Sequence, residues 1–353
     1  MITRRAACAA VLTLWSAACD HSFAGTFAPP DRGPLSGGNP RQVTFNPGSD
    51  LRPSWLPDGS GFFYTRERLD RSDRDRCLGL LPAQGGALRD EICDATAGGL
   101  DSITNFQSAA VAADGRVAYV RASSPLVPPS VAPLRHELRV GTLADPGGVA
   151  VRALPYTAPS GRVHAEAAWV QWLSASELMY LGQSIEYDAS SGVIDTIPVG
   201  LEAVVLEPAL GTLLVIAGTD SATSLAAVHG DSIYYTLPRD GQVLRRSIAN
   251  ATTTIARDYG PGANARDISV QAGRMAVVTG PGLLRLVQLA TGGETLLSAG
   301  LVFFKRPALA PDGHRLVVEG YGYHVDTIRV NGGIVAIDTV ISTLGDLWVF
   351  DLP

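Results

Sequence analysis

Charged residues are scarce in this sequence of 353 residues, in which Asp, Glu, Lys and Arg make up 18% against 46% hydrophobic residues. A composition this apolar excludes disorder as the general state of the chain and is sufficient for a sizeable core. Acidic residues outnumber basic ones by 34 to 28, and the basic residues are scattered along the chain. We therefore expect no positively charged groove and no nucleic-acid partner.

Motifs for the common kinds of catalysis are missing as well. The sequence has no Gly-x-Ser-x-Gly nucleophile elbow, no His-Glu-x-x-His zinc motif, no P-loop, and no Gly-x-Gly-x-x-Gly between a strand and a helix. We therefore assign no catalytic residue, no metal ligand and no cofactor from the sequence.

Long hydrophobic runs are also absent, and the apolar stretch at residues 6–18 is too short to span a bilayer as a helix. Two arginines and no acidic residue precede this stretch, which is the pattern of a secretory signal peptide over residues 1–18. Residues 16–19, Ser-Ala-Ala-Cys, resemble the lipobox of bacterial lipoproteins. This resemblance implies lipidation at Cys19, which would anchor the protein by a lipid on the periplasmic side of a bacterial membrane.

An ordinary signal peptide is the alternative at this end of the chain. Cleavage near Ala18 or Ala24 would leave a soluble periplasmic or secreted protein. Residues 19–39 are rich in Gly, Pro, Ser and Asp, a composition typical of a flexible tether. We therefore divide the chain into a signal peptide, a tether and one folded domain at residues 40–353.

Cysteines are few, and two of the four lie in the signal peptide and at the lipobox. The remaining pair, Cys77 and Cys93, flanks two strand-like runs around a Gly-rich turn. If that hairpin is centred on Gly85, the two cysteines face each other across neighbouring strands, at a separation that a disulfide can bridge. A disulfide suits an oxidising compartment. A metal-binding pair is the alternative, although no further Cys or nearby His supports it.

Glycine and proline, by contrast, are abundant and spread along the chain, with 38 and 23 residues. This distribution favours many short strands joined by turns. A strand–turn–strand pattern at residues 55–64, with Pro57-Asp58-Gly59 at its turn, returns at residues 308–318. Including four weaker copies, equivalent strand positions fall at Phe63, Ala118, Met179, Tyr234, Ala276 and Val317, in steps of 55, 61, 55, 42 and 41 residues.

Those steps suit four-stranded propeller blades, whose basic unit is about 40 to 50 residues, with insertions in the three longer ones. The sequence therefore predicts an all-β, six-bladed β-propeller. The last blade ends with a third strand at residues 346–353, and no fourth strand follows it. Residues 40–45 precede the first blade and have no blade of their own. We expect the N-terminal strand to pair with the C-terminal blade, because this closure removes an exposed strand edge.

Several motifs point to one family. They are Arg-Gln-Val-Thr at residues 41–44, Arg-Pro-Ser-Trp at residues 52–55 followed by the Pro-Asp-Gly turn, and the terminal Leu-Trp-Val-Phe-Asp-Leu at residues 347–352. Together they resemble the six-bladed propeller of TolB-like proteins, over residues 40–353. The resemblance implies a periplasmic protein-binding propeller, whose role in TolB is contact with a peptidoglycan-associated lipoprotein.

The connections between strands two and three and between blades are long and lie on one face of a propeller, which we expect to be the functional surface. The last of them, residues 320–345, contains a segment at residues 327–337 that reads as a β-hairpin, which turns at Asn331-Gly332 and projects beyond its blade. Either it folds over its own propeller or its apolar residues contact a partner. The candidate partner-binding residues are Tyr321, Tyr323, His324, Ile328, Val330, Asn331, Ile334 and Ile337.

These observations predict a membrane-anchored, extracytoplasmic protein-binding scaffold. We expect it to be an accessory or stabilising subunit of a membrane-associated complex in the cell envelope, which it contacts through the long-loop face. The alternative is a propeller enzyme such as a metal-dependent polysaccharide lyase. In that case histidines from different blades would gather at the axis as ligands, and the candidates are His136, His164, His229, His314 and His324.

Overall fold

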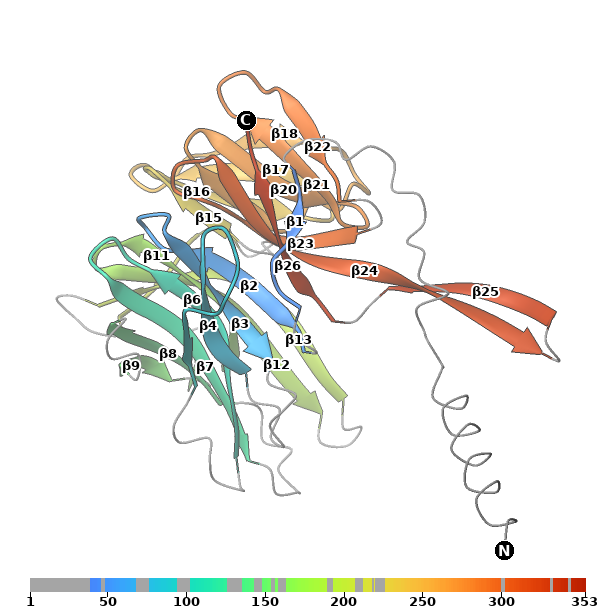
Figure 1. Ribbon diagram of the computed structural model, residues 1–353. Coiled ribbons are helices and arrows are strands. Elements are labelled where there is room, and N and C mark those ends of the chain that lie inside the picture. Colours follow the sequence, from blue (N-terminus) through green and yellow to red (C-terminus); the bar gives the residue numbers. More distant parts are fainter. Residues whose placement is uncertain are drawn as a thin grey trace, which may run out of the picture.

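The structure is a computed structural model of the chain (Figure 1). It describes residues 39–45, 48–67, 76–93, 102–125, 135–142, 148–153, 156–157, 163–188, 193–206, 212–217, 219, 226–299, 302–330, 333–341 and 344–353. The predicted signal peptide, the tether up to residue 38 and Cys19 lie outside the described residues. Among the described residues, no helix is long and apolar enough to cross a membrane.

The described strands form six antiparallel blades, as the repeats predict (Figure 1). Blade 1 comprises β2 (Asp50–Trp55), β3 (Gly61–Glu67), β4 (Arg76–Pro82) and β5 (Asp90–Ile92). Blade 2 comprises β6 (Ser102–Val111), β7 (Arg116–Pro125), β8 (Arg135–Thr142) and β9 (Val149–Ala153). Blade 3 comprises β11 (Val163–Ser174), β12 (Glu177–Asp188), β13 (Val193–Val205) and β14 (Thr212–Val215), with the short β10 (Tyr156–Thr157) paired to β11.

The second half of the ring repeats this arrangement with shorter strands. Blade 4 comprises β15 (Ala226–His229), β16 (Ser232–Leu237), β17 (Gln242–Ser247) and β18 (Thr253–Asp258). Blade 5 comprises β19 (Ile268–Gln271), β20 (Arg274–Thr279), β21 (Leu283–Gln288) and β22 (Glu294–Leu297). Blade 6 comprises β23 (Val302–Leu309), β24 (Arg315–Val330) and β26 (Asp346–Asp351), with β25 (Gly333–Ile341) paired to the end of β24.

The N-terminal strand closes the ring, as predicted. The short β1 (Arg41–Gln42) is antiparallel to β26, and Arg41 pairs with Val349. The Val43 amide extends this contact by donating a hydrogen bond to the Leu347 carbonyl over 2.8 Å. The first and last strands of the domain are therefore neighbours in one sheet, and the third strand of blade 6 does not become an exposed edge.

The turns between the first and second strands of the blades are tight, for a local reason. At the first of them Gly59 has a φ of 68°, a left-handed conformation that glycine adopts without a Cβ clash. The preceding carboxylate of Asp58 accepts a hydrogen bond from the Ser60 amide over 2.9 Å. Asp114 and Asp312 accept the corresponding hydrogen bonds in blades 2 and 6. We call the end of the inner strands that carries these turns the short-turn end, and the opposite end the long-connection end.

The core lies between neighbouring blades. One cluster joins Phe304, Leu316 and Phe350 of blade 6 to Ala276 and Leu284 of blade 5, and all five side chains are buried. The rings of Phe304 and Phe350 meet edge to face, with centroids 5.6 Å apart. Since the other clusters also span adjacent blades, each blade depends on its neighbours for burial of its apolar surface.

Candidate functional site

The predicted hairpin is present at the long-connection end of blade 6. Strands β24 and β25 pair from Tyr323 with Ile341 to Val330 with Gly333, on either side of the predicted turn. Figure 1 shows this β24–β25 ribbon extending away from the propeller, so it does not fold over its own blades. Asn331 lies outside the described residues, as do the side chains of Tyr323, His324, Ile328, Val330, Ile334 and Ile337.

Tyr321, at the base of the ribbon, is the candidate partner-binding residue whose side chain the structure describes. It is 7% exposed, and its hydroxyl donates a hydrogen bond to Glu319 Oε2 over 2.8 Å. The Lys305 ammonium lies 4.4 Å from the centre of its ring. Tyr321 therefore belongs to a buried polar network at the long-connection end.

Glu319 is the centre of this network and is fully buried. Both of its carboxylate oxygens accept hydrogen bonds from Arg306 Nη1, over 3.0 and 2.8 Å. The backbone amide of Arg52, in the innermost strand of the next blade, donates a further hydrogen bond to Glu319 Oε1. The network thus links the last blade to the first beside the closure point.

The two arginines of the network occupy equivalent and unusual backbone positions. Arg52 and Arg306 each precede a proline at a bulge in the innermost strand of a blade. Their φ angles are 55° and 47°, in a left-handed region that non-glycine residues seldom occupy. A carboxylate accepts the backbone amide in both cases, because Arg306 N donates to Asp267 Oδ2 over 3.1 Å. Strain of this kind persists only where the surroundings enforce it, and it concentrates at functional sites.

Burial shifts the protonation equilibria of these groups. Desolvation, followed by the neighbouring Arg306 charge, lowers the pKa of Arg52 to about 10. The Glu319 carboxylate raises the pKa of Arg306, against the effect of desolvation. Burial raises the pKa of Asp267, and it also raises the pKa of Tyr321. Both arginines therefore remain charged at neutral pH.

A central cavity of about 550 Å³ runs between the blades. All six innermost strands, β2, β6, β11, β15, β19 and β23, contribute to its wall. Arg52 and Arg306 line it toward the long-connection end, while Asp114 and Pro311 line it at the short turns. Its other side chains are mostly small or apolar, and the larger ones are Trp55, Trp169, Gln171, Trp172 and Gln271.

Two tryptophans of the cavity wall carry the same inter-blade contacts. Trp55 Nε1 donates a hydrogen bond to the Ala308 carbonyl over 2.7 Å, and the Arg315 guanidinium lies 5.4 Å from its ring centre. Trp172 Nε1 donates to the Ala110 carbonyl over 3.1 Å, with the Arg116 guanidinium at 4.8 Å. In each case the carbonyl and the arginine belong to the preceding blade.

Our sequence reasoning missed this repetition, although a signal was present. Trp172-Leu173 precedes the first turn of blade 3, as Trp55-Leu56 precedes the first turn of blade 1. The turn that follows Trp172 has no Asp-Gly. A search for Asp-Gly turns therefore finds only a weak copy of the repeat in blade 3, although the tryptophan is present there.

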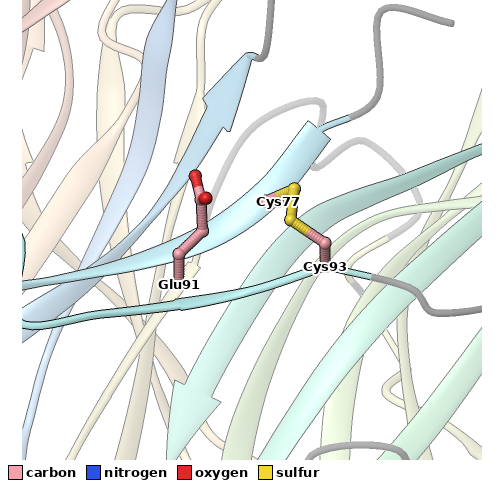
Figure 2. A group of neighbouring side chains, drawn as sticks. All are labelled: Cys77, Glu91 and Cys93. Carbon is pink, nitrogen blue, oxygen red and sulfur yellow. A yellow bond between two sulfur atoms is a disulfide. The ribbon is translucent and has the colours of Figure 1, made fainter. Parts of the chain in front are cut away.

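Cys77 and Cys93 form a disulfide on the outer strands of blade 1 (Figure 2). The neighbouring pairs, Leu78 with Ile92 and Gly79 with Glu91, have the register predicted for a hairpin centred on Gly85. The Glu91 carboxylate lies beside the disulfide and accepts a hydrogen bond from Arg66 Nη1 over 2.7 Å. Because the two sulfurs are bonded to each other, neither is a thiolate that could ligate a metal.

The histidines singled out for a metal site do not converge in the described part of the chain. Within it, Cys77, Glu91 and Cys93 are the one group of three or more His, Cys, Asp or Glu residues close enough to share an ion. His136 is buried in β8, His229 ends β15, and His314 follows the last short turn. The side chains of His164 and His324 lie outside the described residues.

Comparison with known proteins gives likeness in structure only. No family model and no curated protein matches the sequence. TolB from Acinetobacter baumannii is 14% identical, with a TM-score of 0.47, and the match covers 86% of this chain and 63% of that chain. This chain therefore spans less than two thirds of that TolB chain.

Two other solved structures cover most of both chains. The RRP9 WD40 repeats are 12% identical over 91% of this chain and 99% of theirs, with a TM-score of 0.50. A luciferin-regenerating enzyme is 10% identical over 89% of this chain and 95% of its own, with a TM-score of 0.52. At these identities the likeness shows the fold alone. This chain is a six-bladed β-propeller with TolB-like and WD40 structures among its structural neighbours.

Proposed function

We propose that this protein is a membrane-anchored, extracytoplasmic scaffold that binds another protein. It would be an accessory or stabilising subunit of a membrane-associated complex in the cell envelope. The observation that carries the proposal is the β24–β25 ribbon, which leaves the propeller at the long-connection end (Figure 1). Scaffold propellers need only a rigid ring and an accessible surface, whereas an enzyme needs converging reactive groups.

The ribbon has the properties of a contact element. An isolated two-stranded ribbon is marginally stable in water, because it has too little apolar surface to bury. Strand β25 pairs with β24 on one side, and no described strand pairs with its other side. Its nine residues, Gly333–Ile341, contain no Lys or Pro, the residues that commonly protect a free edge. A partner on this edge would supply the missing backbone hydrogen bonds.

The location rests on the N-terminal sequence. Lipidation at Cys19, after removal of residues 1–18, would hold the propeller on the periplasmic side of a bacterial membrane. Residues 19–39 would form the flexible tether between the lipid and the propeller. Confinement to a membrane surface raises the effective concentration of the propeller near a membrane-bound partner. A moderate intrinsic affinity would then be sufficient for stable association.

Crosslinking in native membranes tests the scaffold role. The protein would be captured from gently solubilised membranes through a tag after Pro353, which is exposed. In the test variant, residues 325–339 are replaced by Asn-Gly, which joins the paired positions His324 and Val340. The matched control replaces residues 187–194 by Asn-Gly in the β12–β13 extension, between the paired Glu186 and Asp195.

We expect one stoichiometric partner in the wild type and in the β12–β13 control, and its loss in the variant with the shortened ribbon. Equal capture by all three proteins would contradict the role of the ribbon. A clean monomer without crosslinks in the wild type would contradict the scaffold itself. Separately, Cys19→Ser should move the protein from the membrane fraction to the soluble periplasmic fraction. Continued membrane association of that variant would contradict the lipid anchor.

A further inference from the structure

We propose that the central cavity binds a small organic carboxylate, and that Arg306 holds the carboxylate group. The inference goes beyond the scaffold role and does not depend on it. It rests on the size of the cavity, on the placement of Arg306 between the cavity and a buried carboxylate, and on the distribution of charge along the wall.

The cavity has the dimensions and the lining of a ligand site. Its volume of about 550 Å³ lies within the range of about 300 to 1,000 Å³ that small-molecule sites occupy. Its wall presents polar and apolar surface in similar measure, with tryptophan rings beside neutral polar groups such as Gln171, Gln271 and Ser54. Walls of this kind bury the body of a ligand and orient it through a small number of hydrogen bonds.

Arg306 lies between the cavity and the buried Glu319 carboxylate, which holds its side chain in place. Its contacts with Glu319 engage Nη1 alone, although a guanidinium carries five N–H donors. The Arg306 side chain is 30% exposed while that of Glu319 is fully buried. Since Arg306 lines the cavity, its exposed part faces the cavity. Glu319 therefore fixes the orientation of the guanidinium through Nη1, and the exposed part of the side chain is what a ligand in the cavity would meet.

Charge along the wall orients the ligand. Arg52 and Arg306 line the cavity toward the long-connection end, and Asp114 is the one acidic residue among the described residues that line it. Arg306 lies five residues before Pro311 along the chain, within the bulge of β23 and away from the short turn. An anionic group would therefore lie deep in the cavity, with the neutral part of the ligand toward the short turns.

The charges behind the arginines favour a carboxylate over a phosphate. Glu319 is paired with Arg306, and Asp267 accepts the backbone amide of Arg306. These two acids match the two arginines in number, so the site carries little net positive charge and suits a singly charged anion better than a dianion. A planar guanidinium also matches a carboxylate in geometry.

Binding would be measured by calorimetry and by ligand-detected NMR on the full propeller. The probes are acetate, benzoate, N-acetyl-L-alanine and D-glucuronate, each beside its neutral amide or methyl ester. The last two distinguish an amino-acid source from an acidic-sugar source. We expect at least one carboxylate to bind, with its neutral analogue weaker by about tenfold or more, because a charge-assisted hydrogen bond is lost. The proposal is overturned if no carboxylate binds or if the neutral analogues bind equally well.

The main variant is Arg306→Gln/Glu319→Gln, because Arg306→Gln alone would leave a buried carboxylate without its counter-ion. Its matched control is Arg245→Gln/Asp231→Asn, which neutralises an ion pair on the exposed surface. We expect a loss of about tenfold or more in affinity in the first variant and none in the second. If the first variant does not fold, Arg306→Lys tests the proposal instead. Lysine keeps the positive charge but lacks the planar guanidinium that can bind a carboxylate with two hydrogen bonds. Unchanged affinity in Arg306→Lys would then overturn the proposal.

Discussion

The two ends of the innermost strands are built on different principles. At the short-turn end, Trp55 and Trp172 fasten neighbouring blades through neutral hydrogen bonds and stacked arginines. At the long-connection end, bulged strands carry Arg52 and Arg306 in left-handed conformations around the buried Glu319. The contact at the first end recurs in blades 1 and 3. The second end depends on charged partners from particular blades, so a single substitution there has fewer ways to be accommodated.

The pKa values of several carboxylates also differ between the two ends: they are lowered at the short-turn end and raised at the long-connection end. The Ser60 amide, the Arg116 side chain and the Ser232 hydroxyl lower the pKa of the exposed Asp58, Asp114 and Asp231 by hydrogen bonding. Desolvation instead raises the pKa of Asp267 and of Asp346, the latter to about 6. Water and local hydrogen bonds stabilise charge at the short turns, whereas charge at the other end must be compensated by specific contacts.

We expect the largest loss of stability from a substitution in the buried network at the long-connection end. Glu319→Ala should lower the free energy of unfolding by about 3 to 5 kcal/mol, because it leaves the Arg306 guanidinium without its partner. It also removes the acceptor of the Arg52 amide. Urea denaturation measures the loss, with Glu319→Gln as the milder matched change. A cost below about 1 kcal/mol, typical of an exposed ion pair, would contradict a buried network.

The disulfide bridges the outer strands of blade 1 at the same end. Cys93→Ser should lower the free energy of unfolding by about 3 kcal/mol if the chain-entropy model holds for this loop. The double change Cys77→Ser/Cys93→Ser should cost the same, and the wild type should reach the same stability on reduction. Thermal melting with and without reductant measures this. A melting temperature that does not respond to reduction would refute a stabilising disulfide.

A smaller effect is expected at the short-turn end. Trp172→Phe keeps an aromatic ring but removes the hydrogen bond to the Ala110 carbonyl, at a cost of about 1 kcal/mol. Trp55→Phe is the matched change at the equivalent contact with Ala308, and we expect a similar cost. Denaturation of the two variants side by side measures the equivalence. If either costs more than Glu319→Ala, the contrast between the two ends is reversed.

The smallest effect concerns Asp346, which is partly buried beside Thr44. Its pKa in the folded protein, about 6, lies above the ordinary value of 3.8, so the folded state binds the proton more tightly than the unfolded state. This contribution to stability is complete below the ordinary pKa and disappears as the pH rises through about 6.

Asp346→Asn should therefore stabilise the protein near pH 8 and have little effect near pH 4. The amide keeps an acceptor for the Thr44 hydroxyl, which donates to Asp346 Oδ1 in the wild type. Free energies of unfolding at both pH values measure the difference between the variants. A stabilisation that is equal at the two pH values would show that packing, and not the charge, is responsible.

Local pattern was sufficient for much of the fold. The register around Gly85 follows from hairpin symmetry, and it correctly predicted the Cys77–Cys93 disulfide. The unpaired third strand at the C-terminus predicted the pairing of β1 with β26. The Asn-Gly dipeptide predicted a hairpin at residues 327–337, and the paired strands extend further, from Tyr323 with Ile341 to Val330 with Gly333. Each of these inferences uses residues that are close in sequence, or a count of strands, and backbone geometry fixes the rest.

Neither the cavity nor the buried network could be predicted in this way. Arg52 and Glu319 lie 267 residues apart, and they meet because the ring closes between blades 1 and 6. The direction of the ribbon was likewise open in the sequence, because its apolar residues suit either a fold-back contact or an outward contact.

The sequence by itself determined the number of blades, the turns, the closing strand and the disulfide, because strand periodicity and turn chemistry act over a few residues. Only the tertiary structure decided where the charged side chains meet, which residues line the central cavity and where the ribbon points. Those features depend on the closure of six blades into one ring, which brings distant residues into a region with little water and makes their pairing obligatory.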